Sequence, residues 1–476
     1  MEQKLTSAFG WKFFERASVQ GTNFLVTLLL ARLLTPSDYG MVSIVLIFIT
    51  LATIFVQGGF NTALIQKKNV CDNDYTTILF FSEFIAVVAF FVLFIISPVV
   101  ERVYHSVGLS RLLRVMALVL FPGAFNSVQV AYITRDLRFK VLSVSSLISS
   151  LIAAVVAIVL ALKGFGVWAL VAQQLINQIS TCVVTYSIVR WTPKGHFSFQ
   201  SLKTLLPFGS KVFASNFITA FFLDIRGLII GQAYSSDALG YFNRGKQFPQ
   251  AIMESVNTTI QTVLLPVYSK KQDSMAYVTE MVSRTIRISS LILFPMMVGL
   301  AYVAEPLVSL LLTDKWLPCV PFLRIFCICY LFQAIQIPII QAFKGIGDSG
   351  TPLKLEIMKK SVEIILLFST IHLGLYPFAL SLLVSSIISQ ALNMIYANKV
   401  IKYSARRQVK DIVPATAFSA LMGVSIAFIN KLIHNVVIKL LLGMVTGVLV
   451  YFFLCYIFHI PEIGMALTYL KPKKNR

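Results

Sequence analysis

Charged side chains are scarce in this chain. They make up 13% of its 476 residues, whereas 57% of the residues are hydrophobic. No polar stretch between the apolar runs is long enough to fold as a water-soluble domain. This composition is typical of an integral membrane protein and excludes an ordinary soluble globular fold.

Cysteine and histidine are also rare. The 6 cysteines are scattered, mostly in or beside apolar runs, which indicates neither a disulfide framework nor a zinc site. Gly-rich phosphate loops, a Gly-x-Ser-x-Gly elbow and His/Glu sets at metal-ligand spacing are absent from the sequence. We therefore expect no catalytic residue, no bound metal and no cofactor.

Acidic residues number 20 against 41 Lys and Arg, which gives a net charge of +21. In a membrane protein an excess of Lys and Arg first indicates which segments lie in the cytoplasm, because these residues concentrate on cytoplasmic segments. Most basic residues outside the apolar runs fall on one side when both termini are placed in the cytoplasm. The charge therefore needs no nucleic-acid partner, and we expect none.

The apolar runs predict an all-α, multi-pass membrane protein with about fourteen transmembrane helices. We expect a break near Pro306 in the ninth of them. The predicted ranges are 11–34, 39–61, 76–99, 112–133, 141–162, 166–189, 206–233, 241–268, 279–311, 317–344, 353–374, 376–400, 411–432 and 436–458.

An internal repeat connects the two halves of the chain. The segment from Ala31 to Gly40 is echoed 200 positions later by the segment from Gly231 to Gly240, each with a Ser-Asp turn before its final glycine. Arg114 and Arg324 lie in a second echo. The repeat predicts two six-helix lobes, 1–202 and 203–408, related by a pseudo-twofold axis along the membrane normal. Residues 409–476 add two helices outside the repeat and a basic cytoplasmic tail.

Polar side chains mark one face of the predicted helix 241–268. The eight residues fall within about 60° of one line along the helix. They are Asn243, Lys246, Gln247, Gln250, Glu254, Asn257, Thr258 and Gln261. A charge facing lipid at the centre of a helix costs about 2.5–3.5 kcal/mol, so this face must meet water or another polar helix.

Three other predicted helices also carry polar groups. Combined with the stripe at 241–268, they predict a hydrated central cavity as the substrate path. Its candidate residues are Lys12, Arg16, Gln20, Asn23, Gln57, Lys211, Asp224, Arg226, Arg244, Lys246, Gln247, Gln250, Glu254 and Asn257. The alternative is that they join helices by hydrogen bonds of about 0.6 kcal/mol each. For Gln57 alone the two readings are equally good.

A set of short segments, in order along the chain, carries a family resemblance over about residues 10–345. The chain resembles the polysaccharide (Wzx-type, colanic-acid-exporter-like) flippases of the multidrug/oligosaccharidyl-lipid/polysaccharide superfamily. The matching segments include Gly10-Trp11, Leu30 to Gly40, Gly58-Gly59-Phe60, Arg135 to Phe139, Gly164 to Val171, Asp224 to Gly231, Leu239-Gly240-Tyr241 and Lys315-Trp316. Gln232 departs from the pattern, since relatives commonly carry arginine there.

The resemblance implies alternating access in a bacterial inner membrane. The substrate would be a polyprenyl-pyrophosphate-linked oligosaccharide, moved to the outer leaflet for surface polysaccharide or lipopolysaccharide synthesis. Where such proteins are coupled to Na+ or H+, a carboxylate inside the membrane is expected, and Asp224 and Glu254 are the candidates. Membrane lipid and other polysaccharide-assembly proteins are the implied partners.

Rival functions remain open at this point. Within the superfamily they are an ion-coupled multidrug exporter and a peptidoglycan-precursor flippase. From another class, a membrane glycan polymerase or ligase is disfavoured because the predicted outer loops are short.

Overall fold

The computed structural model describes the whole chain except residues 1–20, 23–24, 137, 270–273, 349 and 460–476. The described part is helical, without a strand, and helices occupy the fourteen predicted ranges, the first only in its described part. In the described part of the chain, eleven helical segments are long and apolar enough to cross a membrane. The predicted all-α, multi-pass class is thereby confirmed.

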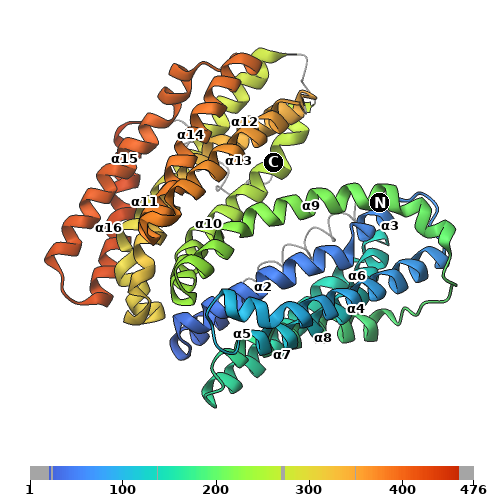
Figure 1. Cartoon of the computed structure of the whole chain (residues 1–476). Coiled ribbons are helices and arrows are strands. Elements are labelled where there is room, and N and C mark those ends of the chain that lie inside the picture. Colours follow the sequence, from blue (N-terminus) through green and yellow to red (C-terminus); the bar gives the residue numbers. More distant parts are fainter. Residues whose placement is uncertain (1–20, 23–24, 137, 270–273, 349, 460–476) are drawn as a thin grey trace, which may run out of the picture. The chain divides into compact units, whose positions relative to one another are not determined.

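The chain divides into two compact units, residues 1–240 and 241–476 (Figure 1). The predicted lobe boundaries at 202 and 408 stay predictions. The helices of the first unit are α2 (Pro36–Gln57), α3 (Phe60–Gln66), α4 (Asp72–Val103), α5 (Leu109–Met116), α6 (Leu120–Arg135), α7 (Phe139–Leu162), α8 (Val167–Val189) and α9 (Phe199–Ala233).

Helix α10 (Ser236–Ser269) begins in the last residues of the first unit and continues into the second. The remaining helices are α11 (Met275–Leu312), the 3-10 helix η2 (Asp314–Cys319), α12 (Val320–Gly345), α13 (Gly350–Thr370), the 3-10 helix η3 (Ile371–Leu373), α14 (Leu375–Ile401), α15 (Ala405–Leu432) and α16 (Val436–Ile457). In Figure 1, α15 and α16 run side by side, and both pack on α11.

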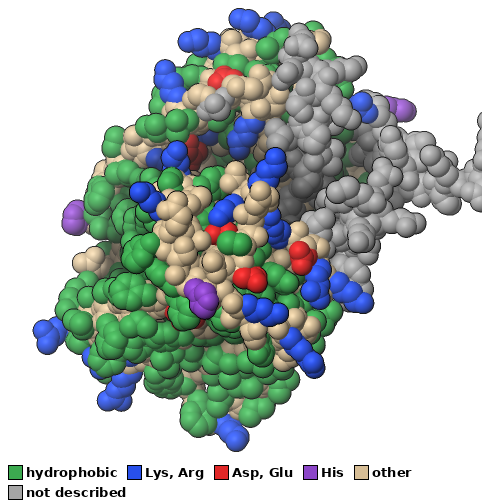
Figure 2. All heavy atoms as spheres, turned by 90° about the vertical axis from the view of Figure 1, so that its right-hand side faces the viewer, with side chains coloured by type: hydrophobic (Ala, Val, Ile, Leu, Met, Phe, Trp, Pro, Cys, Tyr) green, Lys and Arg blue, Asp and Glu red, His purple; other side chains and the backbone are tan. Residues whose placement is uncertain are grey.

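The helices pack as membrane helices do. Small residues let α7 approach α8 closely, and Ser149, Ala153 and Ala157 on α7 are buried. Large apolar residues on α4 and α16 are instead exposed, as lipid-facing residues must be. On the face shown in Figure 2, hydrophobic side chains cover most of the lower part, with Lys and Arg side chains at the lower edge.

The predicted break near Pro306 is wrong, because α11 continues through both Pro295 and Pro306. A proline leaves the carbonyl four residues earlier without its helical donor. The carbonyl of Tyr302 accepts instead from Asn430 Nδ2 on α15 at 2.9 Å, and the carbonyl of Leu291 accepts from the Tyr451 hydroxyl on α16 at 2.8 Å. Neighbouring helices thus supply the missing donors.

The predicted helix 39–61 is, conversely, split into α2 and α3. Gly58 and Gly59 both adopt left-handed backbone conformations, with φ of 53° and 70°. A Cβ at Gly59 would lie 2.5 Å from the carbonyl oxygen of Gly209 on α9, so the break also permits a close backbone approach.

Candidate functional site

The two segments predicted to be equivalent begin their helices in the same way. Thr35 Oγ1 accepts from the backbone N–H of Asp38 at 3.2 Å. Ser235 Oγ accepts from the N–H of Ala238 at 3.0 Å, 200 positions later. Both hydroxyls cap an orphan donor of the first helical turn, which explains why the Ser/Thr pattern recurs.

The same two helix starts touch each other reciprocally. A Cβ at Gly40 would lie 1.7 Å from the carbonyl oxygen of Ser236, and a Cβ at Gly240 would lie 2.2 Å from that of Pro36. Both obstacles are backbone atoms, so only glycine fits at either position. Each glycine therefore meets the backbone of the other of the two segments that are predicted to be equivalent.

Four of the predicted path residues, Lys12, Arg16, Gln20 and Asn23, lie outside the described residues. The others in the first unit are on α2 and α9, which pack against each other. Gln57 and Asp224 are half-buried, Lys211 is exposed and Arg226 is buried. Their place in a substrate path stays a prediction.

Helix α10 separates a polar face from an apolar one, as its sequence predicts. Lys246, Gln250 and Asn257 are half-buried and Glu254 is exposed. Gln250 Nε2 donates to Glu254 Oε1 at 2.6 Å, which joins two members of the stripe. On the apolar side, Phe242 and Met253 are among the buried residues.

Arg244 takes a position that the stripe alone did not reveal. Its guanidinium lies 4.9 Å from the ring centroid of Trp316, which is fully buried, and its Nη1 donates to Gln247 Oε1. A cation over an indole face is a stabilising contact. This contact holds the start of α10 against η2.

An apolar cavity of about 730 Å³ lies in the second unit, on the other side of α10 from its polar face. It is lined by Ile252 of α10 and by residues of α11, α15 and α16. Gly299, Gly443 and Gly447 leave room for it, and the hydroxyl of Tyr451 in its wall is already bonded to the Leu291 carbonyl. The cavity therefore offers an apolar surface to a ligand.

This cavity was not predicted from the sequence. The signal was the spacing of Gly443 and Gly447, four residues apart in an apolar helix, which is a pattern of close helix approach in membranes. Helices α15 and α16, which lie outside the predicted repeat, thus contribute to a cavity on α11.

These features define a multi-pass membrane protein with an amphipathic helix, α10, and an apolar cavity beside it. The model of the family described as "Polysaccharide biosynthesis protein" matches residues 29–321, more than half of the chain. The chain belongs to this family.

Two curated relatives and one solved structure are similar to it. The teichuronic acid biosynthesis protein TuaB of Bacillus subtilis is 22% identical over 289 residues, 60% of each chain, so the match spans less than two thirds of that relative. The succinoglycan biosynthesis transport protein ExoT of Rhizobium meliloti is 23% identical over 73% of this chain and 70% of its own. The lipid II flippase MurJ in an inward closed conformation shares the fold, with a TM-score of 0.76 at 15% identity, over 96% of this chain and 100% of its own.

Proposed function

We propose that this protein is a flippase that carries a polyprenyl-pyrophosphate-linked oligosaccharide from the inner to the outer leaflet of a bacterial inner membrane. Both termini would lie in the cytoplasm, and the protein would act by alternating access without catalysing a reaction. The similarity to ExoT, a succinoglycan biosynthesis transport protein, and to the lipid II flippase MurJ supports this class.

The observation that carries the proposal is the two-sided character of α10. Gln250 and Glu254 lie on its polar face, whereas Ile252 lines the apolar cavity. Residues two apart on a helix point in nearly opposite directions. One helix therefore offers hydrogen bonds to a sugar headgroup and, on its other side, an apolar surface to a long prenyl chain.

Asp224 and Glu254 are the carboxylates we propose for coupling to Na+ or H+, because the charge of an intramembrane carboxylate responds to either ion.

The test is export of surface polysaccharide in a strain that depends on this protein. Glu254→Ala and Gly447→Leu should each lower export by about tenfold or more, the first through the sugar-binding face and the second by filling the cavity. Val445→Leu is the matched control, since Val445 lies on the exposed side of the same helix and should keep wild-type export. Lipid-linked intermediate should accumulate on the cytoplasmic side, and the abundance of each variant is measured in parallel.

Wild-type export from both Glu254→Ala and Gly447→Leu, at equal abundance, contradicts the assignment of α10 and its cavity. Resistance to drugs without any effect on surface polysaccharide would indicate a drug exporter. Arrest of cell-wall synthesis would indicate a peptidoglycan-precursor flippase.

A further inference from the structure

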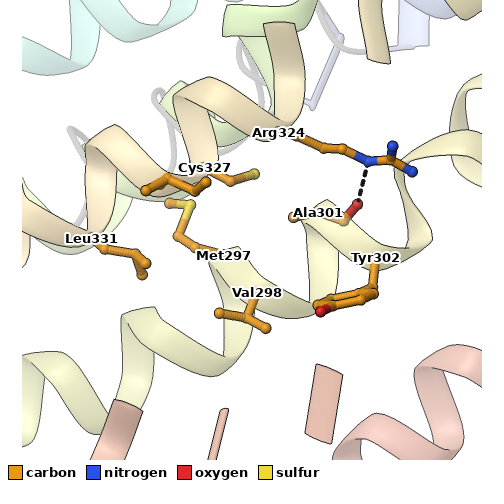
Figure 3. A pocket seen from close by; sticks show the side chains of 8 residues that line it. Met297, Val298, Ala301, Tyr302, Arg324, Cys327 and Leu331 are labelled. Carbon is orange, nitrogen blue, oxygen red and sulfur yellow. Dashed lines mark hydrogen bonds between the residues drawn. The ribbon is translucent and has the colours of Figure 1, made fainter. Parts of the chain in front are cut away.

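A second pocket, of about 470 Å³, lies between α11 and α12 in the second unit (Figure 3). Helix α11 contributes Met297, Val298, Ala301 and Tyr302, and helix α12 contributes Arg324, Cys327, Ile328 and Leu331. Figure 3 shows Met297, Val298 and Leu331 at one end and the guanidinium of Arg324 at the other. The pocket is therefore apolar along its length and positively charged at one end.

Arg324 is held at that end by a single hydrogen bond. Its Nε donates to the carbonyl oxygen of Ala301 at 3.2 Å, and this is its one acceptor in the described part of the chain. The bond orients the guanidinium while both terminal nitrogens stay available, and the side chain is exposed. A planar guanidinium with two free NH2 groups suits the bidentate recognition of a phosphate.

The other residues of the lining carry no charge, so the charge of the lining is that of Arg324, and a ligand group with one negative charge would balance it. The nearest acidic residue along α11, Glu305, does not line it. Ile328 is 41% exposed and lies on α12, a helix long and apolar enough to cross the membrane. The apolar part of the pocket is therefore open on the side of this helix that faces away from the protein. An acyl chain can enter from that side.

We propose that this pocket binds one anionic phospholipid, with its phosphodiester on Arg324 and an acyl chain along Met297, Val298 and Leu331. A phosphodiester carries the single negative charge that one arginine balances. A diphosphate would need further cations, and the lining offers none. The proposal does not depend on the transport function proposed above.

The experiment uses the purified full-length protein in detergent, with phosphatidylglycerol added and bound lipid counted by native mass spectrometry. Arg324→Ala should lower the retention of one phosphatidylglycerol by about fivefold, the loss expected for one basic residue at a lipid phosphate. Ile328→Trp should lower it as well, because the indole fills the apolar part without touching the charge. Arg111→Ala is the matched control, as an exposed arginine of α5 in the first unit.

Unchanged retention in Arg324→Ala or in Ile328→Trp overturns the proposal, as does an equal loss in Arg111→Ala. Inorganic phosphate is added in a parallel series to separate the two sources of phosphate. Displacement of the lipid by inorganic phosphate at equal concentration would show a free-anion site and would also overturn it.

Discussion

Arg114 and Arg324 occupy similar surroundings in the two halves of the chain, yet their guanidinium groups make different contacts. Each arginine comes after a helix that contains a proline with an aromatic residue four positions before it. The pair is Phe94 and Pro98 in α4, before Arg114, and Tyr302 and Pro306 in α11, before Arg324. The guanidinium of Arg114 lies 4.2 Å from the centroid of the Phe94 ring, and its Nε donates to Ser97 Oγ at 2.8 Å. Among the described residues, Arg324 donates to the Ala301 carbonyl alone, and it lines an open pocket.

Each proline leaves the carbonyl four residues before it without a helical donor. The two units supply different hydrogen-bond donors to that carbonyl, and this accounts for the difference. In the first unit Ser97 Oγ donates to the Phe94 carbonyl at 2.8 Å and also accepts from Arg114. In the second unit the residue before Pro306 is Glu305, which is exposed, and Asn430 from α15 serves the Tyr302 carbonyl. In the second unit a side chain of α15 thus does for Tyr302 what Ser97 does for Phe94, and the Arg324 hydrogen bond goes to the Ala301 carbonyl instead.

Of the substitutions at these sites, Ser97→Ala should lower the free energy of unfolding the most. The Ser97 hydroxyl is fully buried and joins the Phe94 carbonyl, Arg114 and Ser110, whose Oγ donates to it at 2.9 Å. Ser97→Ala should lower the free energy of unfolding by about 3 kcal/mol, near 1 kcal/mol for each lost partner. Denaturant unfolding in detergent micelles measures the change, and Glu305→Ala is the control, expected within about 0.5 kcal/mol of wild type. Equal losses in the two variants would contradict the difference between the copies.

The two arginines give a smaller contrast in the same measurement. Arg114→Ala removes a charge-assisted hydrogen bond and a cation–π contact, which together stabilise by about 2 kcal/mol. Arg324→Ala removes one bond at an exposed side chain and should change stability by less than about 0.5 kcal/mol in lipid-free detergent. Addition of phosphatidylglycerol should widen the gap between wild type and Arg324→Ala. A loss of stability in Arg324→Ala as large as in Arg114→Ala, without lipid, would show that both arginines are structural.

The sequence predicts the helices well because the bilayer permits few alternatives. A segment of about 20 apolar residues must satisfy its backbone internally, so hydropathy alone locates it. It also predicts the polar face of α10, because a 3.6-residue period shows which residues share a face. Glu254 and Gln250 are joined there as that period suggests.

The errors and omissions depend on contacts distant in sequence. Pro306 predicts a break in α11. The helix continues because Asn430, more than a hundred positions later, donates to the carbonyl that the proline leaves without a partner. Arg244 is predicted to line the central cavity, but its guanidinium packs on the ring of Trp316, more than seventy positions later. The apolar cavity requires α11, α15 and α16 together, and no periodicity within one helix reports such a space.

Asn430→Ala should lower the free energy of unfolding by less than Ser97→Ala or Arg114→Ala does. The bond from Asn430 Nδ2 to the Tyr302 carbonyl is the second unit's substitute for Ser97, but the residue is half-buried, so water can replace part of the lost bond. Asn430→Ala should therefore cost about 1 kcal/mol of unfolding free energy, less than Ser97→Ala. Hydrogen exchange around residues 302–306 should increase, because an unsatisfied carbonyl loosens the turn beside Pro306. Lys431→Ala, an exposed neighbour, is the control, and unchanged exchange in Asn430→Ala would show that α11 passes Pro306 without help from α15.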